Sequence, residues 1–191
     1  MAVYELAEGV LERVASTSTP QPVLAVVRRR VADPDAVKAA DFVVVADRVA
    51  DPGNLGTILR SAEAAGVELV GLTTGSVDPF NPKSVRSSAG ALFRVPVADP
   101  LGWPELARAG RALYATSSHH GVPYDEIDMS GPVVIVVGSE SHGVDDAAPV
   151  DGWLTIPHRG RAESLNVAMA ATVLCFEVAR QRRASPSSLA P

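Results

Sequence analysis

The chain has 191 residues, which suits one domain or one domain with a fragment of another. Apolar residues make up 47% and charged residues 20%, an ordinary composition for a globular protein. No apolar run approaches the roughly 20 residues that a membrane-spanning helix needs, and the first residues lack the basic-then-apolar order of a secretory signal. Since Cys175 is the single cysteine, an internal disulfide is excluded, and we expect a cytoplasmic protein with this thiol packed in the core.

The formal net charge of −5 argues mildly against a general nucleic-acid binder, because such proteins are usually basic. The arginines are unevenly placed, however, and guanidinium groups bind phosphates through a fork of donors, so arginine clusters can hold RNA on an acidic protein. Solvated surface charge is the simpler explanation for any single one of them. The candidate phosphate-binding residues are Arg28, Arg29, Arg30, Arg86 and Arg159.

The first forty residues have a weak pattern: helical spacing over 4–14, an extended stretch at 20–27 and a polar, proline-containing linker at 31–40. Short apolar strands then alternate with helices, which predicts an α/β fold with a parallel sheet covered on both faces. Ligands bind such sheets at the carboxyl ends of the strands. In chain order, we expect strands at 42–46, 67–72, 93–97, 112–116, 132–138 and 153–157, helices at 54–65, 82–88, 103–110 and 164–182, and a disordered tail at 184–191.

The histidines do not suggest a metal site. His119 and His120 are adjacent and point in different directions, while His142 and His158 are isolated, so the usual zinc-ligand spacings are missing. We therefore expect no bound metal.

Three loops at predicted strand ends carry the polar residues that suggest chemistry. The first, 51–60, places proline and glycines between a strand and a helix, and the free amides of such a helix start favour an anion. Arg60 lies about one and a half turns into the helix and can lean back toward its start, so a phosphate or ribose oxygen could meet both Asn54 and Arg60. The alternative, a plain turn with a surface arginine, is favoured by spacing alone.

The second loop, 138–143, follows the most apolar strand. Glycines at both of its ends let backbone amides approach a ligand closely. Glu140, at the end of a buried strand, needs a partner such as Arg60 or a cationic ligand. A tight turn with a solvated glutamate is the alternative.

The third loop, 156–166, connects a strand to the long C-terminal helix. Ser164 and Asn166 are poor residues inside a helix and good ones at its start. Helix capping alone explains one of these two residues. It does not explain why two small polar residues occur next to one loop with an anionic residue and another with a cationic residue.

Together, the three loops resemble the motifs of the SpoU/TrmH family of RNA ribose 2′-O-methyltransferases, within the SPOUT superfamily. The asparagine–arginine motif corresponds to NLGTILRSAEAAG, the glycine–serine–glutamate motif to VVIVVGSESHG and the serine–leucine–asparagine motif to IPHRGRAESLNVAMAA. The segment KSVRSSAGALFRVPV is similar to the family's linking region. The likeness covers about 41–182; each motif alone is weak evidence, whereas the three in the family's order are strong evidence.

The resemblance implies a catalytic SPOUT domain over 41–183, with the C-terminal segment threaded through a loop to form a deep trefoil knot. It implies S-adenosylmethionine as methyl donor, structured RNA as substrate, and a homodimer whose site draws on both subunits. The GxGxxG fingerprint of ordinary dinucleotide-binding folds is absent from the sequence, which fits a different cofactor mode. Residues 1–40 are similar to the end of an L30e-like RNA-binding domain with its linker, which favours ribosomal RNA over transfer RNA.

Carried over to this sequence, the resemblance implies that Asn54 and Arg60 orient the ribose and its phosphate, and that Glu140 holds Arg60 or the ribose. Ser164 and Asn166 shape the pocket near the donor. An arginine keeps its proton at neutral pH, so we interpret Arg60 as a clamp for phosphate and oxyanion rather than as a base. The residues expected around the donor are Thr116, Gly138, Ser139, Ile156, Pro157, Ser164, Leu165 and Asn166.

Two other hypotheses are open. One is a non-catalytic RNA-binding or ribosome-assembly module of the same fold, against which the intact set of motif residues argues. The other is a SPOUT enzyme that methylates a base nitrogen, a group that uses different motifs. Donor binding separates the first hypothesis from catalysis, and nuclease-resistant dinucleotides separate ribose from base methylation.

Overall fold

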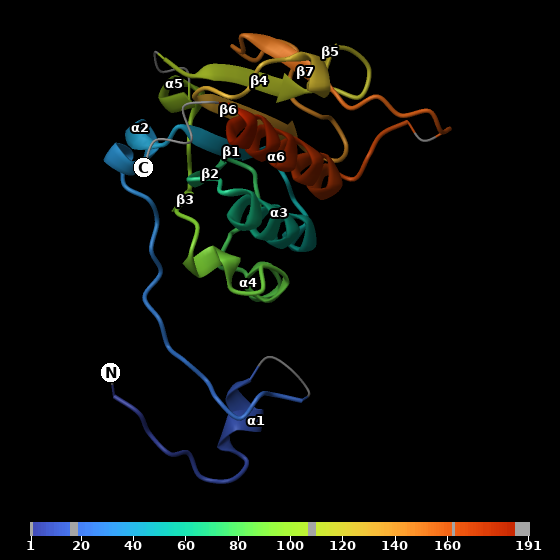
Figure 1. Cartoon of the computed structure of the whole chain (residues 1–191). Coiled ribbons are helices and arrows are strands. Elements are labelled where there is room, and N and C mark those ends of the chain that lie inside the picture. Colours follow the sequence, from blue (N-terminus) through green and yellow to red (C-terminus); the bar gives the residue numbers. More distant parts are fainter. Residues whose placement is uncertain (1, 16–18, 107–109, 162, 186–191) are drawn as a thin grey trace.

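The computed structural model describes residues 2–15, 19–106, 110–161 and 163–185. Its body is a sheet with helices on both faces (Figure 1), and every strand pair in it is parallel, in the order β3-β2-β1-β6-β4-β7-β5. The predicted parallel sheet flanked by helices is confirmed. The strands are β1 (Phe42–Asp47), β2 (Leu69–Leu72), β3 (Val97–Ala98), β4 (Ala112–Thr116), β5 (Val122–Pro123), β6 (Val133–Gly138) and β7 (Gly152–Thr155). The helices are α1 (Val10–Val14), α2 (Pro34–Ala39), α3 (Pro52–Ala65), α4 (Pro82–Ser87), α5 (Trp103–Leu106) and α6 (Val167–Ala184), with 3-10 turns η1 (Ala91–Phe93) and η2 (Tyr124–Glu126).

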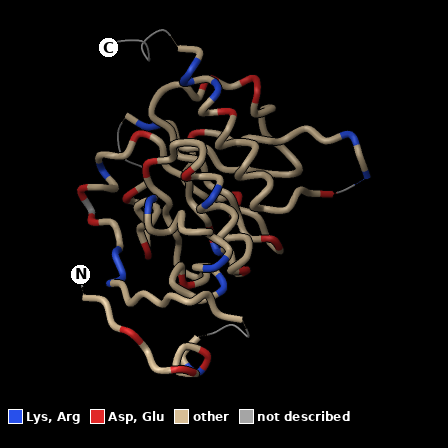
Figure 2. Tube along the Cα trace, turned by 60° about the horizontal axis from the view of Figure 1, so that its bottom comes forward, with Lys and Arg blue, Asp and Glu red and all other residues tan. Residues whose placement is uncertain are grey.

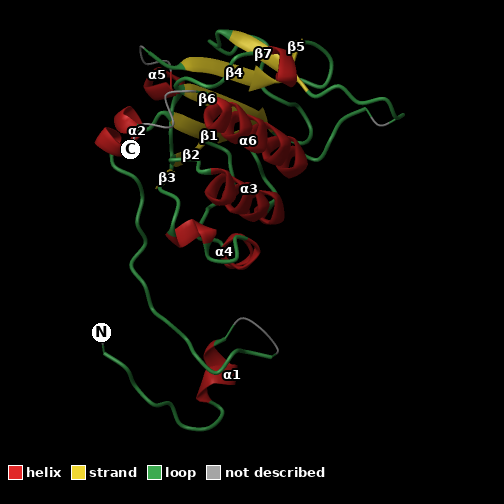
Figure 3. Cartoon of the chain, in the orientation of Figure 1, coloured by secondary structure: helices red, strands yellow, loops and turns green. Residues whose placement is uncertain are grey.

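The central strands β1 and β6 are neighbours, and every residue of both is buried. Their nearly continuous apolar sequences are what a strand covered on both faces requires. Side chains alternate between two cores: Phe42 and Val44 pack with residues of α3 and α6, whereas Val43 and Val45 pack with residues of α2 and α5. Figure 3 shows α3 and α6 together on one face of the sheet.

The α3 helix begins and ends at the expected signals. Asp51 caps its first turn, with Oδ1 accepting a hydrogen bond from the backbone N–H of Asn54 at 2.8 Å, and Pro52 follows the cap. The helix ends at Gly66, whose φ of 82° lies in the left-handed region that glycine adopts without cost. Asn54 is thereby fixed in the first turn, beside the carboxyl end of β1.

The α6 helix starts later than predicted. The cap is Asn166, whose Oδ1 accepts hydrogen bonds from the N–H groups of Ala168 at 2.9 Å and Met169 at 3.3 Å. The helix therefore begins at Val167, and Ser164 lies outside it in the preceding loop. Of the two candidate capping residues, Asn166 caps the helix.

The predicted linker at 31–40 was wrong in part, because it contains α2. Asp33 accepts a hydrogen bond from the N–H of Ala36 at 2.8 Å and Pro34 follows it, the same cap-then-proline signal that indicated α4. The guanidinium of Arg111 donates to the carbonyl oxygens of Val37 and Ala40, both at 2.8 Å. These bonds hold the end of α2 against the sheet.

Several boundaries also differ from the predictions. The helical spacing over 4–14 produces only the short α1, and the extended stretch at 93–97 is a 3-10 turn followed by the two-residue strand β3. Strand β5 was not predicted. The predicted helix at 103–110 is α5 at its start, while 107–109 lie outside the described residues, as do 186–191 of the predicted tail. The trefoil knot stays a prediction.

Candidate functional site

The carboxyl ends of β6, β4 and β7 open into a cavity of about 820 Å³. Its walls come from the segments 116–120, 137–146 and 163–170, together with the end of β7. The volume falls within the range of about 300–1,000 Å³ that small-molecule sites occupy. The cavity therefore lies at the edge of the sheet that was predicted to bind a ligand.

The residues expected around a donor lie mostly in this wall. Pro157 is the exception, since its neighbours Ile156 and His158 line the cavity instead. Sequence reasoning named the loop after β4 but missed His120, Asp146 and Trp153, which also line the cavity. His120 packs on Trp153 with ring centroids 4.8 Å apart, and its Nε2 lies 3.9 Å from Asp146. The predicted residues that line the cavity are Thr116, Gly138, Ser139, Ile156, Ser164, Leu165 and Asn166.

The loop after β6 folds back onto the strand from which it comes. The N–H of Gly143 donates to the carbonyl oxygen of Ser139 at 2.9 Å, and the two residues form an antiparallel bridge. A Cβ on Gly138 would lie 2.1 Å from the carbonyl carbon of Gly143. Glycine is therefore required at position 138 by this close backbone approach, and the loop backbone faces the cavity.

Three polar side chains from the three motif loops form one hydrogen-bonded chain. Asn54 Nδ2 donates to Glu140 Oε1 at 2.6 Å, and Asn166 Nδ2 donates to Asn54 Oδ1 at 3.0 Å. These residues are separated by 86 and 112 positions in the sequence. The fold alone brings them together at the rim of the cavity.

The helix cap of α6 sets the direction of this chain. Because Asn166 Oδ1 is occupied by backbone N–H groups, its amide nitrogen is the atom that faces Asn54. Asn54 must then present its oxygen to Asn166, which leaves its own amide nitrogen for the carboxylate of Glu140. The N-cap residue Asn166 thus orients Asn54, and through Asn54 it orients the carboxylate of Glu140.

Arg60 lies elsewhere within the single chain. It lines a separate hollow between α3 and α6, together with Thr57, Met169 and Phe176. Glu140 is exposed and accepts its hydrogen bond from Asn54, so neither the expected burial of Glu140 nor its contact with Arg60 is present. Position 60 is six residues beyond Asn54, which places the two side chains on different faces of α3.

The start of α3 is held by charge and by close packing. Asp51 Oδ2 lies 3.2 Å from Lys83 Nζ of α4, and the backbone hydrogen bond from Asn54, with help from Lys83, lowers the pKa of Asp51. A Cβ on Gly56 would lie 1.8 Å from Ser87 Oγ and 2.8 Å from the carbonyl carbon of Ser87. Gly56 therefore lets α3 and α4 approach closely, which fixes the helix turn that carries Asn54.

The candidate RNA-binding arginines are all exposed. Arg29 lies 3.8 Å from Asp78, with its guanidinium 5.2 Å above the ring of Phe80. Arg86 is on α4, and Arg159 is in the loop between β7 and α6. Figure 2 shows Lys and Arg residues near the tip of this loop, which projects from the body of the domain.

The charge of the cavity suits a cationic ligand. Glu140, Asp145, Asp146 and Glu163 line it, and among the described lining residues there is no lysine or arginine. S-adenosylmethionine carries a sulfonium and an ammonium group, so such a wall fits it, whereas a phosphate would be repelled. The apolar side chains of Val137, Leu154 and Ile156 could contact an adenine base, and they line the cavity too.

The described residues do not indicate a metal site, a membrane-spanning helix or a reactive thiol. Across the described ranges, no group of three or more His, Cys, Asp or Glu residues could hold a metal ion. No helix in the described part of the chain is long and apolar enough to cross a membrane. Cys175 is buried as predicted, and its burial raises the pKa of the thiol to about 12.

The chain matches the model of the SpoU rRNA methylase family over residues 41–176. It is 40% identical to the Bacillus subtilis 23S rRNA (guanosine(2553)-2′-O)-methyltransferase RlmP, over 92% of this chain and 71% of the relative. It is 33% identical to the Streptomyces viridochromogenes 23S rRNA (uridine(2479)-2′-O)-methyltransferase, over 95% of this chain and 68% of the relative.

Solved structures agree with this relationship. The AviRb SpoU methyltransferase of Streptomyces viridochromogenes in complex with AdoMet matches with a TM-score of 0.73 and 35% identity, over 82% of this chain and 67% of that chain. An AdoMet-bound rRNA methyltransferase from Sinorhizobium meliloti also has a TM-score of 0.73 and 35% identity, over 80% of this chain and 61% of that chain. The chain therefore belongs to the SpoU rRNA methylase family, and it is an RNA 2′-O-ribose methyltransferase that uses S-adenosylmethionine.

Proposed function

We propose that the substrate is ribosomal RNA of the large subunit, methylated on one ribose 2′-hydroxyl. The observation that carries this proposal is the hydrogen-bonded chain of Asn54, Glu140 and Asn166 at the rim of an acid-lined cavity. Two relatives that match over more than nine tenths of this chain are named for 2′-O-methylation of 23S rRNA. Transfer RNA is the second candidate, because a structural neighbour titled for methylation of tRNA position 34 matches at 25% identity.

In the proposed arrangement, the donor lies in the cavity. S-adenosylmethionine supplies a methyl group on a positively charged sulfur. Backbone at Thr116, Gly138, Ile156 and Leu165 contacts the adenosine part, and the carboxylates in the wall favour the cationic part. Ser164, Ser139 and Pro157 complete the loops around it. The rim is then the place where a ribose can reach the methyl group.

The residues at the rim orient the ribose. Asn54 and Glu140 are held by each other, so their remaining polar atoms have fixed directions for a sugar hydroxyl. A guanidinium cannot accept a proton at neutral pH, so we assign Arg60 to the phosphate and to the charge that develops on the attacking oxygen. The proton leaves through an RNA phosphate or through water.

We further propose that the enzyme is a homodimer. The hollow that Arg60 lines is bordered by exposed apolar side chains of α6, with Met169 51% and Phe176 45% exposed. Exposed apolar patches of this kind are typical of protein interfaces. A second copy on this face would cover them, and it would bring the Arg60 of one subunit toward the rim of the other. The site would then draw on both chains.

The remaining expectations from the resemblance stay part of the proposal. Residues 1–40 are the end of an L30e-like RNA-binding domain, and exposed apolar side chains such as Val23 and Val26, 77% and 97% exposed, would suit packing within a domain. Residues 41–183 form the SPOUT domain with its trefoil knot. Arg28, Arg29, Arg30, Arg86 and Arg159 contact RNA phosphates. A ribosomal RNA substrate places the enzyme in the cytoplasm.

The test has two stages. Calorimetric titration with S-adenosylmethionine is expected to show binding, and incubation with ribosomal RNA and labelled donor is expected to yield a nuclease-resistant dinucleotide. Arg60→Ala is expected to lower methyl transfer at least about 100-fold with donor affinity nearly unchanged, and Arg60→Lys to remain poor because the guanidinium fork is lost. Label on a base, or on transfer RNA alone, would contradict the proposed substrate. Equal loss of donor binding and turnover would contradict the role of Arg60.

A further inference from the structure

Arg48 has an unfavourable backbone conformation immediately after β1. Its φ is 55°, in the left-handed region, which costs free energy for a residue with a Cβ. Glycine would occupy this position without that cost. Residues held in such conformations persist only where their surroundings overdetermine them, and they concentrate at functional sites.

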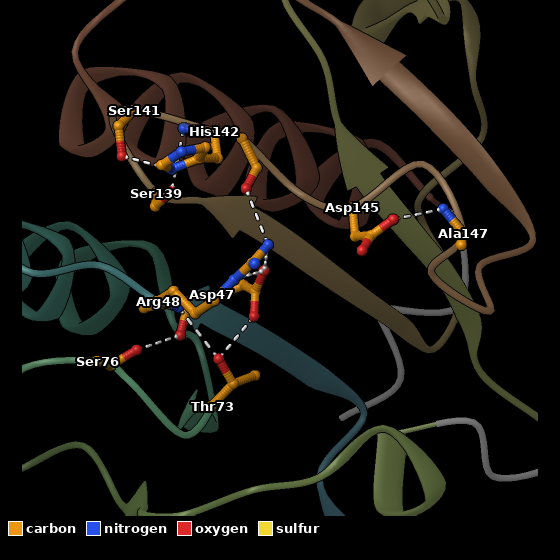
Figure 4. A network of polar contacts seen from close by, with 11 residues as sticks. Asp47, Arg48, Thr73, Ser76, Ser139, Ser141, His142, Asp145 and Ala147 are labelled. Atoms are coloured by element: carbon orange, nitrogen blue, oxygen red, sulfur yellow. Dashed lines mark hydrogen bonds and ion pairs between the residues drawn. The ribbon is translucent and has the colours of Figure 1, made fainter.

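Two buried polar side chains hold Arg48 in place. Thr73, at the end of β2, accepts a hydrogen bond from the backbone N–H of Arg48 at 3.1 Å and donates its hydroxyl to Asp47 Oδ1 at 2.6 Å. The other oxygen of Asp47 receives Nε and Nη2 of Arg48, at 3.2 and 3.1 Å. Asp47 is 4% and Thr73 7% exposed, so the carboxylate needs these donors. Figure 4 shows this network.

The guanidinium of Arg48 also reaches across to the loop after β6. Its Nη2 lies 3.4 Å from the carbonyl oxygen of Gly143, which lines the donor cavity. Asp47 and Gly138 are register partners at the carboxyl ends of β1 and β6, so Arg48 spans the gap that opens where the two strands end. The loop it reaches carries Glu140.

Pairing with the buried Asp47 accounts for two of the contacts of Arg48 but not for its reach to Gly143. An arginine on the strained backbone costs stability that a glycine would not, and nearly half of its side chain, 43%, is exposed, which limits the energy of its ion pair. What the arginine adds, and glycine cannot, is one rigid group that joins a buried carboxylate to the loop around the cavity.

We propose that Arg48 is a positioning residue for the methyl-transfer site. It fixes the loop 139–143 against the end of β1, so that the cavity wall at Gly143 and the carboxylate of Glu140 are in place before the donor and the RNA arrive. Arg48 itself contacts neither the donor nor the RNA. This inference rests on the proposed use of the cavity for S-adenosylmethionine.

The test compares Arg48→Gly and Arg48→Lys with the natural protein. Arg48→Gly relieves the backbone strain but leaves the buried carboxylate of Asp47 without its guanidinium partner, so the melting temperature is expected to fall. Its affinity for S-adenosylmethionine, measured by calorimetry below the melting transition, is expected to fall about five- to tenfold, the order expected for one lost hydrogen bond. Arg48→Lys keeps a positive charge beside Asp47 but loses the fork, and an intermediate affinity is expected.

A second readout needs no donor. Hydrogen exchange in the free protein is expected to become faster at the amides of 139–144 in Arg48→Gly, with the rest of the sheet unchanged. The matched control is Ser76→Ala, which removes a hydrogen bond to the carbonyl oxygen of Ala46 at the same end of β1 without touching the loop. This control is expected to leave both loop exchange and donor affinity as they are.

The outcomes separate this inference from the proposed function. If the natural protein binds no S-adenosylmethionine, the proposed use of the cavity is wrong, and the exchange experiment still tests whether Arg48 holds the loop. If the natural protein binds it and Arg48→Gly binds equally well, Arg48 is not a positioning residue. Faster hydrogen exchange throughout the sheet in Arg48→Gly, rather than at 139–144 alone, would show a purely structural role and overturn the proposal.

Discussion

The two ends of the central strand pair are built differently, although β1 and β6 run between them in one register. At the amino end, Arg182 of α6 donates to the carbonyl oxygens of Asp41 at 3.1 Å and Gly131 at 3.0 Å, with its guanidinium 4.9 Å above the ring of Phe42. At the carboxyl end, Arg48 makes a longer bond of 3.4 Å to an exposed loop. The amino end is closed by a helix, whereas the carboxyl end remains open around a cavity.

This difference shows that one end of the sheet stabilises the fold and the other end is the one proposed to bind the ligand. At the amino end, Arg182 satisfies two backbone carbonyls directly, which stabilises the fold. At the carboxyl end, exposed side chains form hydrogen bonds with one another. Their polar atoms are therefore accessible to a ligand, but this end of the sheet is locally less stable. Ligand-binding loops are drawn from the less stable parts of a protein for this reason. Four substitutions test the comparison.

The largest effect is expected from Gly138, the last residue of β6. In Gly138→Ala, the new Cβ would meet the backbone of Gly143 and Val144 at 2.1–2.2 Å, so the loop must move. We expect a loss of about 3 kcal/mol or more in unfolding free energy, together with loss of donor binding. Gly131→Ala, at the opposite end, has nothing within 4 Å and is the control. Equal stability of the two variants in urea unfolding would contradict the close approach.

The next effect separates stability from ligand binding. Arg182→Met removes the donors for two backbone carbonyls, and we expect a loss of about 2 kcal/mol in unfolding free energy. Because Arg182 is at the amino end, donor affinity measured below the melting transition is expected to stay within about twofold. The exposed neighbour Arg183 provides the control, Arg183→Met, with little change expected. A large loss of affinity in Arg182→Met would show that the two ends are coupled.

At the rim, Asn166→Asp changes one atom of the hydrogen-bonded chain. The carboxylate still caps α6, so the melting temperature is expected to be unchanged within experimental error. It cannot donate to Asn54, and it places a second carboxylate near Glu140, so methyl transfer is expected to fall at least about tenfold. Asn81→Asp makes the same change at the cap of α4, away from the rim, and is the control. Full activity of Asn166→Asp would refute the role of the chain.

The smallest effect concerns the cap of α3 and its pH dependence. Since the pKa of Asp51 is lowered in the folded protein, chiefly by the backbone hydrogen bond from Asn54, its charge stabilises the fold fully above the ordinary value of 3.8. This contribution is lost as the pH falls through the lowered pKa. Asp51→Asn keeps a cap without the charge, so the unfolding free energies of the two proteins from urea titrations should differ at pH 7 by less than about 1 kcal/mol, and the difference should shrink as the pH falls below 3.8. A constant difference would contradict the shift.

Much of the fold followed from local signals. The strands β1 and β6 were visible as apolar runs, α3 as a turn of proline and glycines before a helical pattern, and α4 as a cap followed by proline, because these signals depend only on neighbouring residues. The same signal at Asp33 and Pro34 was present but was interpreted as a linker, since the stretch is polar. Strand β5 could not be found, because two residues carry no periodic pattern, and the extended stretch predicted at 93–97 overlaps the short β3 only at Val97.

For the site, the sequence identified the three motif loops, and seven of the eight residues predicted around the donor line the cavity, with Pro157 outside it. It did not identify the partner of Glu140, which is Asn54 rather than Arg60 within the chain. His120 and Trp153 were missed because their contact joins two different strand ends. Arg48 was also missed, since nothing in its local sequence shows that its backbone is left-handed.

By itself, the sequence determined which residues form buried strands, where helices start, and to which family the motifs belong, because each of these depends on a short stretch of chain. Only the tertiary structure decided which side chains meet at the rim, on which face Arg60 lies, and how Arg48 reaches the loop of Gly143. Contacts between residues about a hundred positions apart depend on strand order and register, and no local pattern of residue types encodes these.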